Sequence, residues 1–252
     1  FAHSLRAIHQ RLAGAGAPLL CTVADDPNIQ SASDAAAQCA GALPTNAHDG
    51  IALEPVRAAI QEIWVTNTQV NFCAKAYPTV PSGHPDAPAL SVLAAFLRNG
   101  FLHRTIREQG GAYGGGASHD PNIAAFRFFS YRDPRLVETL DDFDASIIWL
   151  LETQHEQLAL EEAILSVMAS LDKPGSPAGE AKRDFHERLF GRTTEHRRIL
   201  RADIVGTTLD DLRRVTETYL KPELASTAVI THTAGADIVA GRQLPLTRQD
   251  LL

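Results

Sequence analysis

The sequence predicts a layered α+β or α/β domain, and three observations support this fold class. Strand and helix patterns alternate along much of the chain, and a run of helices then precedes a last strand. Residues 68–76 (TQVNFCAKA) alternate with the period of two that is typical of a strand with one solvated face. Residues 86–109 repeat apolar side chains with a helical period instead. With 252 residues and 44% hydrophobic content the chain can bury a core, and we predict one domain over residues 1–252.

Four segments favour β-strands because they are rich in β-branched or aromatic residues. In residues 68–76, Val70 and Phe72 fall on one face of the strand, and Asn71 and Cys73 fall on the other. One face of this strand is therefore expected to meet solvent or a ligand. The four segments are residues 18–25 (PLLCTVAD), 68–76, 123–131 (IAAFRFFSY) and 225–232 (ASTAVITH).

The segment 86–109 predicts a helix that is sandwiched between two layers. At 3.6 residues per turn, one set of apolar side chains lies within about 80° of arc, namely Leu90, Leu93, Leu97 and Phe101. A second set lies on the opposite side, namely Val92, Leu102 and Ile106. Gly110 and Gly111 follow the last turn and supply the left-handed stop that commonly ends a helix.

Further helices are indicated at the start of the chain and in its second half. Residues 1–16 show a helical pattern. Asp133 can cap a helix whose first position suits Pro134, and Thr208 with Asp211 resembles a capping box. The other expected helices cover residues 133–152, 156–172, 181–200 and 207–223, with a loop or linker at residues 173–180 (KPGSPAGE).

The charge of the chain and its cysteine content indicate which kinds of binding partner and which cellular compartment are expected. The 23 basic and 30 acidic residues give a net charge of -7, which disfavours nucleic acid as a partner. Three widely spaced cysteines, Cys21, Cys39 and Cys73, indicate reduced thiols in a cytosolic setting. No stretch approaches the roughly 20 apolar residues of a membrane span. The start at Phe1 inside a helical pattern suggests an excised or processed part of a longer polypeptide.

Zinc motifs are incomplete in this chain. An HExxH motif would need a second histidine where Ala159 and Phe190 stand. The inverted HxxEH motif would need its first histidine where Arg192 stands. We therefore predict that this chain binds no metal or other cofactor of its own.

Motifs for nucleophilic hydrolysis and phosphate binding are also incomplete. No GxSxG elbow is present, and Ser118-His119-Asp120 is interpreted as a strand end that runs into a turn at Pro121. The run GGAYGGG lacks the lysine of a phosphate-binding loop, and it follows a helix instead of preceding one. A nucleotide site is not expected.

Arg107 and Tyr113 stand six residues apart across a glycine hinge and are the remaining candidate site residues. Structural roles are available for both, because Arg107 can offset the negative end of the helix macrodipole and Tyr113 can pack as a strand aromatic. In the functional interpretation, the hinge brings a guanidinium and a phenol to one point, where two donors bind a carbonyl oxygen and stabilise an oxyanion. The glycines at positions 114 to 116 would let a foreign backbone lie close, as when a peptide joins a sheet edge.

Residues 84–116 (HPDAPALSVLAAFLRNGFLHRTIREQGGAYGGG) resemble the carboxy-terminal half of the pitrilysin or insulinase family of zinc metallopeptidases, and most closely its presequence-protease branch. The resemblance implies four related domains in two halves, with zinc held by the amino-terminal half. It also implies that Arg107 and Tyr113 bind substrate carbonyl oxygens near the scissile bond, with Tyr113 helping to stabilise the tetrahedral intermediate. Gly111 and Gly114 are predicted to bind the substrate as well. By the same resemblance, the domain is a mixed, mostly antiparallel sheet of five or six strands flanked by helices.

Because HxxEH is absent, the chain resembles the zinc-free part of such an enzyme. We therefore expect a domain that is inactive alone and that completes the site of a peptide-degrading zinc metalloendopeptidase. Its expected partners are the zinc-bearing half, in the same protein or a partner subunit, and a peptide substrate, with no nucleic acid and no membrane. The expected location is the cytoplasm of a bacterium. The alternatives are a non-catalytic scaffold or binding domain of the same superfamily, and an independent hydrolase that uses Ser118 or a cysteine.

Overall fold

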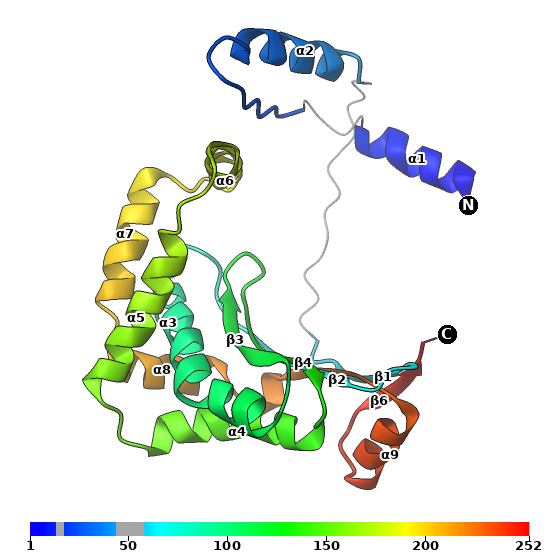
Figure 1. Cartoon of the computed structure of the whole chain (residues 1–252), viewed down its shortest axis with the longest axis vertical. Helices are drawn as coiled ribbons and strands as arrows, with labels where there is room; N and C mark the ends of the chain where they lie inside the picture. The colour runs from blue at the N-terminus through cyan, green and yellow to red at the C-terminus, as the bar shows by residue number, and fades with distance from the viewer. Residues whose placement is uncertain (14–17, 44–57, 252) are drawn as a thin grey trace. The chain divides into compact units, whose positions relative to one another are not determined.

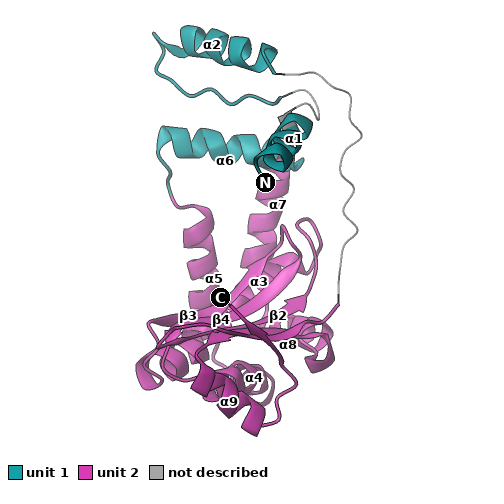
Figure 2. Ribbon diagram, turned by 90° about the vertical axis from the view of Figure 1, so that its right-hand side faces the viewer, with its two compact units in different colours: residues 1–56, 174–193 teal, residues 57–173, 194–252 magenta. Residues whose placement is uncertain are grey.

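The computed structural model describes residues 1–13, 18–43 and 58–251. The chain divides into two compact units (Figure 2). Unit 1 comprises residues 1–56 and 174–193, and unit 2 comprises residues 57–173 and 194–252. One boundary falls between Lys173 and Pro174, inside the expected linker. A single domain over residues 1–252 stays a prediction, because compactness does not establish which part folds independently.

Unit 1 contains the helices α1 (Ala2–Ala13), α2 (Ile29–Gly41) and α6 (Pro177–Leu189). The helix predicted at the start of the chain is confirmed. Ser176 caps α6 by accepting a hydrogen bond from the Gly179 amide at 3.1 Å. The strand predicted at residues 18–25 is wrong, because these residues form no strand. A strand needs a neighbour for its amides and carbonyls, and the described elements of unit 1 are helical.

Unit 2 contains a six-stranded sheet in the order β3-β4-β2-β5-β1-β6. The β3–β4, β4–β2 and β2–β5 pairs are antiparallel, and β1 runs parallel to both β5 and β6. This topology confirms the expected mixed, mostly antiparallel sheet. The strands are β1 (Gln61–Val65), β2 (Asn71–Pro78), β3 (Gly114–Asp120), β4 (Ala125–Asp133), β5 (Ser226–Thr231) and β6 (Thr247–Asp250).

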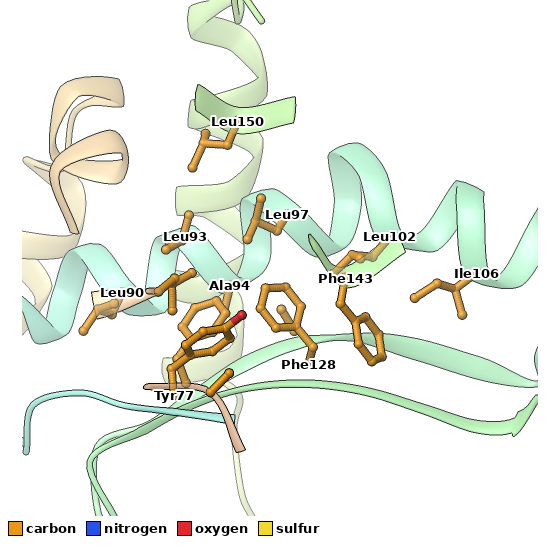
Figure 3. Packing of buried hydrophobic residues seen from close by; sticks show 14 of the residues in the cluster. Tyr77, Leu90, Leu93, Ala94, Leu97, Leu102, Ile106, Phe128, Phe143 and Leu150 are labelled. Atoms are coloured by element: carbon orange, nitrogen blue, oxygen red, sulfur yellow. The ribbon is translucent and has the colours of Figure 1, made fainter. Parts of the chain in front are cut away.

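Helices of unit 2 pack against one face of this sheet (Figure 1). Tyr77 and Phe128 point from the strands toward the helix that carries Ala94, and both are fully buried (Figure 3). The helical elements of unit 2 are α3 (Ala87–Leu97), η1 (Arg98–Gln109), α4 (Val137–Glu152), α5 (Gln157–Leu171), α7 (Thr194–Val205), α8 (Leu209–Tyr219), the short η2 (Pro222–Leu224) and α9 (Thr233–Gly241). The opposite face of the sheet is more exposed.

Strand β2 shows which of its two alternating faces is covered. Asn71 and Cys73 are buried, whereas Phe72 on the other face is 37% exposed. A buried amide needs partners, and Asn71 has them. Its Nδ2 donates to the carbonyl oxygen of Asp133 at 3.1 Å, and its Oδ1 accepts from the Thr231 hydroxyl at 2.5 Å. The polar side of the pattern thus faces the core.

The helix predicted at residues 86–109 is present but changes its winding. Its first part, α3, lies between β3 on one side and α5, α7 and α8 on the other, as expected for a sandwiched helix. Its second part, η1, is a π-helix. Hydrogen bonds from residue i to i+5 widen the turn, so that Leu97, Leu102 and Ile106 are all buried at spacings of five and four. Leu102 and Ile106 were expected on the side of the helix opposite to Leu97. That expectation assumed an α-helical period, which does not continue past Leu97.

The boundaries of two later helices test the predicted caps. Thr208 and Asp211 form the expected capping box of α8, with the Asp211 amide donating to the Thr208 hydroxyl at 3.1 Å. The cap predicted at Asp133 is wrong, because α4 begins at Val137. Instead, the Asp133 carboxylate accepts a hydrogen bond from the Arg135 amide at 3.0 Å. This bond forms a turn before the helix.

Asp86 joins the start of α3 to α8. Its carboxylate accepts a hydrogen bond from the Tyr219 hydroxyl at 2.6 Å and from the Arg214 guanidinium at 2.8 Å. Burial alone raises the pKa of Asp86, but the hydrogen bonds from Tyr219 and Arg214 outweigh it, and the net pKa is lowered. Burial and the bond to Asp86 raise the pKa of Tyr219 to about 12.

A lowered folded-state pKa predicts acid sensitivity for this junction. The stabilisation by Asp86 is present above its unfolded pKa of about 3.9 and is lost as the pH falls through the folded value. The free energy of unfolding, measured by urea denaturation from pH 6 to pH 3, should therefore fall more steeply for the unmodified chain than for Asp86→Asn. Equal slopes would mean that Asp86 contributes nothing to acid sensitivity.

Candidate functional site

Arg107 lies in the last turn of η1, directly before the glycine hinge. Two amides of the hinge donate hydrogen bonds to carbonyls of the last helical turn. Gly111 N–H donates to the Arg107 carbonyl and Ala112 N–H donates to the Ile106 carbonyl, both at 3.1 Å. Gly111 has a φ of +79°, which confirms the left-handed stop and favours glycine at this position. The helix therefore ends with Arg107 exposed on its surface.

The negative end of this helix is already served by another residue. The Arg135 guanidinium donates to the Thr105 carbonyl at 3.1 Å and pairs with Asp142 at 2.9 Å. A side chain at Gly110 would collide with this guanidinium, so Gly110 leaves it room. By contrast, the Arg107 guanidinium has no hydrogen bond or ion pair to any residue within 58–251. The structural role considered for Arg107 is thus largely taken by Arg135.

Tyr113 stands between the hinge and β3. Its amide donates to the Arg132 carbonyl at 3.2 Å, which fixes its backbone to β4. Its side chain is 65% exposed and is not part of the core. The ring lies 5.6 Å from the Tyr131 ring, and the Arg132 guanidinium lies over it at 5.7 Å from the centroid. Both predicted site residues are therefore exposed, and their convergence on one ligand stays a prediction.

The glycines that follow Tyr113 are explained by contacts within the chain. A Cβ on Gly114 would lie 2.5 Å from the Tyr131 hydroxyl, and one on Gly115 would lie 2.8 Å from Ile106. A Cβ on Gly116 would lie 2.8 Å from Arg98. The three positions let η1 and Tyr131 pack closely on β3, so they need no foreign backbone to account for them. Substrate contact by Gly111 and Gly114 stays a prediction.

Sequence reasoning missed Tyr131 and Arg132. The β2–β4 register pairs Asn71 with Asp133 and Cys73 with Ser130, so two β4 residues face one β2 residue in a β-bulge. The bulge leaves both Tyr131 and Arg132 exposed beside Tyr113. The sequence did contain a sign of the bulge. If β4 alternated regularly, Arg132 would share the buried face of Phe126 and Phe128, and a charged side chain at such a position indicates a break in the alternation.

The serine, histidine and aspartate at the end of β3 do not form a triad with one another. The Ser91 hydroxyl, not that of Ser118, lies 3.3 Å from Nδ1 of His119. Burial lowers the pKa of His119 to about 4. Strand β3 ends at Asp120 and a turn follows, which confirms the interpretation as a strand end.

One cavity of unit 2 is separate from Arg107 and Tyr113. Its volume is about 740 Å³, and it lies between α3, α5, α7 and the end of β3. Neither Arg107 nor Tyr113 lines it. The candidate site is therefore an exposed surface at the edge of the sheet.

No three histidine, cysteine or acidic side chains within residues 1–13, 18–43 and 58–251 are grouped as metal ligands. Over the same residues, no helix has the length and apolar character needed to cross a membrane.

Solved structures place this fold among peptidase domains. A protease from Helicobacter pylori matches with a TM-score of 0.65 and 15% identity, over 84% of this chain and 53% of that one. A peptidase M16 inactive domain from Pseudomonas fluorescens matches with a TM-score of 0.63 and 17% identity, over 81% of this chain and 51% of that one. Pitrilysin matches with a TM-score of 0.59 and 13% identity, over 90% of this chain and 25% of that one. At these identities the likeness defines the fold: an M16-type peptidase domain.

The family follows from the sequence itself. The chain belongs to the family described as the PreP C-terminal domain, whose model matches residues 61–233. It is 37% identical to the mitochondrial presequence protease of Kluyveromyces lactis over 163 residues, which are 64% of this chain and 16% of that protein. It is 40% identical to that of Drosophila melanogaster over 162 residues, 64% and 15% respectively. The chain thus spans about a sixth of the length of these relatives.

The comparisons confirm the resemblance to presequence proteases and correct the expected location. A bacterial cytoplasmic location is wrong, because the matching relatives are mitochondrial proteins of eukaryotes. The cysteine count had pointed to a reducing compartment, but it cannot distinguish cytosol from other compartments that keep thiols reduced.

Proposed function

We propose that this chain completes the active site of a zinc metalloendopeptidase whose zinc is held by another domain. In this proposal the complete peptidase is the polypeptide or complex in which this chain and a zinc-bearing half occur together. A mitochondrial location and peptide substrates are proposed with it, by likeness to the relatives. The described residues offer no ligand group for zinc, so we assign this chain no step at a metal.

The observation that carries the proposal is an unused guanidinium beside an exposed phenol. Arg135 serves the helix end, so Arg107 is available to a ligand. Tyr113 is exposed although its backbone is fixed to β4. Each can donate a hydrogen bond to the carbonyl oxygen of an extended peptide. Such hydrogen bonds become stronger as negative charge develops on that oxygen. Tyr113 is proposed to stabilise the tetrahedral intermediate, and Arg107 to hold the substrate.

The position of β3 also favours a peptide ligand. It is the last strand on its side of the sheet, so its outer amides and carbonyls face no further strand within residues 58–251. An extended peptide can pair with such an edge and present a carbonyl to residues at the start of the strand. Tyr113 directly precedes that start.

A complementation assay tests this function. Cleavage of an unstructured peptide is measured with the purified chain alone, with the zinc-bearing half of a presequence protease alone, and with both mixed. We expect cleavage only in the mixture. Equal cleavage by the zinc-bearing half alone would favour the scaffold alternative. Cleavage by this chain alone would favour an independent hydrolase.

A further inference from the structure

The β-bulge of β4 places a second cation beside Tyr113. Regular alternation would send Arg132 to the covered face of the sheet, where Phe126, Phe128 and Ser130 are buried. The extra residue in β4 reverses this direction, so Arg132 lies on the exposed side with Tyr131. Arg132 has a φ of +50°, a conformation that non-glycine residues rarely adopt.

The neighbours of Arg132 hold it in this conformation. On one side, Tyr131 is paired with Gly114 in the β3–β4 ladder. On the other side, Asp133 is fully buried, and its carboxylate accepts hydrogen bonds from the Arg135 amide at 3.0 Å and the Thr139 hydroxyl at 2.8 Å. Residues in such uncommon conformations persist where the surrounding structure determines them, and they cluster at functional sites.

Both the backbone and the side chain of Arg132 contact Tyr113. The Arg132 carbonyl accepts the Tyr113 amide at 3.2 Å, and the guanidinium carbon lies 5.7 Å from the centre of the Tyr113 ring. That distance is within the range of a cation–π interaction. Arg132 has no carboxylate partner within residues 58–251 that would draw its guanidinium away from the ring.

We infer that Arg132 is a positioning residue, which holds the Tyr113 ring so that its hydroxyl points at the substrate carbonyl. This inference rests on the proposed function. Because the ring is largely exposed, it has few packing contacts to fix its rotamer, and Tyr131 and Arg132 supply its ring contacts. Without the guanidinium, the hydroxyl would sample more orientations and be aimed correctly for a smaller fraction of the time.

The test is a double-mutant cycle in the complete peptidase with Arg132→Gly and Tyr113→Phe. Glycine accepts the left-handed φ, so Arg132→Gly keeps the bulge and removes only the side chain. We expect Arg132→Gly to lower kcat about 3- to 10-fold with KM little changed. We expect it to have no further effect in the Tyr113→Phe background, where no hydroxyl remains to be aimed.

Matched variants separate positioning from strain relief and from misfolding. Gln243 has a φ of +55° and is exposed at the end of α9, so Gln243→Gly relieves similar strain away from Tyr113 and should leave kcat unchanged. If Arg132→Gly fails to fold, Arg132→Asn takes its place, because asparagine also tolerates this conformation.

Each outcome of the cycle has one meaning. Full activity of Tyr113→Phe would refute the proposed function itself. Reduced activity of Tyr113→Phe with unchanged activity of Arg132→Gly would overturn only the inference about Arg132. Equal losses from Arg132→Gly in both backgrounds would overturn it too, because Arg132 would then act independently of the Tyr113 hydroxyl.

Discussion

Replacement of Tyr113 by Phe is expected to lower kcat of the complete peptidase about 100- to 1,000-fold, the usual effect of losing one oxyanion donor. The ring remains, so its contacts with Tyr131 and Arg132 are kept and only the hydroxyl is lost. KM should change little, because the hydroxyl acts mainly on the charge that develops in the transition state. Steady-state cleavage of a fluorogenic peptide measures both constants.

Arg107→Ala extends the same experiment and should lower kcat/KM by a comparable factor, partly through KM, because Arg107 is proposed to hold the bound substrate as well. Arg104→Ala is the matched control, since Arg104 is also an exposed arginine of η1. Its activity should equal that of the unmodified enzyme. Similar losses from Arg104→Ala and Arg107→Ala would indicate a general effect of positive charge on this helix, and not a specific contact.

The largest expected effect on stability is at Phe128. Its ring is fully buried, stacks on Phe143 at 5.5 Å, and meets Tyr77 and Phe126 edge-on. Phe128→Ala should lower the free energy of unfolding by about 3 to 5 kcal/mol, through lost apolar burial and the cavity that remains. Urea denaturation of the purified chain, followed by circular dichroism, measures this change.

Phe129→Ala is the control for this prediction, because it removes an identical side chain from the next position of β4. Phe129 lies on the opposite face of the sheet and is only partly buried. Phe129→Ala should lower the free energy of unfolding by less than half as much as Phe128→Ala does. Equal costs at the two positions would contradict the one-sided covering of the sheet.

Local sequence patterns predicted the elements whose causes are local. The alternation in residues 68–76 and the capping box at Thr208 each depend on residues close in sequence, and both appear as expected. The hinge glycine Gly111 was predicted for the same reason. By contrast, residues 18–25 have a strand-like composition but no neighbouring strand, and composition cannot supply a hydrogen-bonding partner.

The features that escaped prediction depend on pairing between distant segments. Strand β1 is short and carries charged and polar residues, and its identity comes from lying between β5 and β6. The bulge at Arg132 appears only once β4 is registered against β2. In the candidate site, Arg107 and Tyr113 were found from their spacing across the glycine hinge, and the family resemblance added their expected roles. Arg132, by contrast, required the register of the sheet.

The exposed face of the sheet has a practical consequence for the chain in solution. Phe72 and Ile230 are paired across β2 and β5 and are 37% and 38% exposed, and Trp64 is paired with Ile230 across β1. Adjacent apolar side chains on neighbouring strands form a continuous adhesive patch. Purified alone, this chain should therefore self-associate as its concentration rises, and light scattering would detect the onset before any loss of secondary structure.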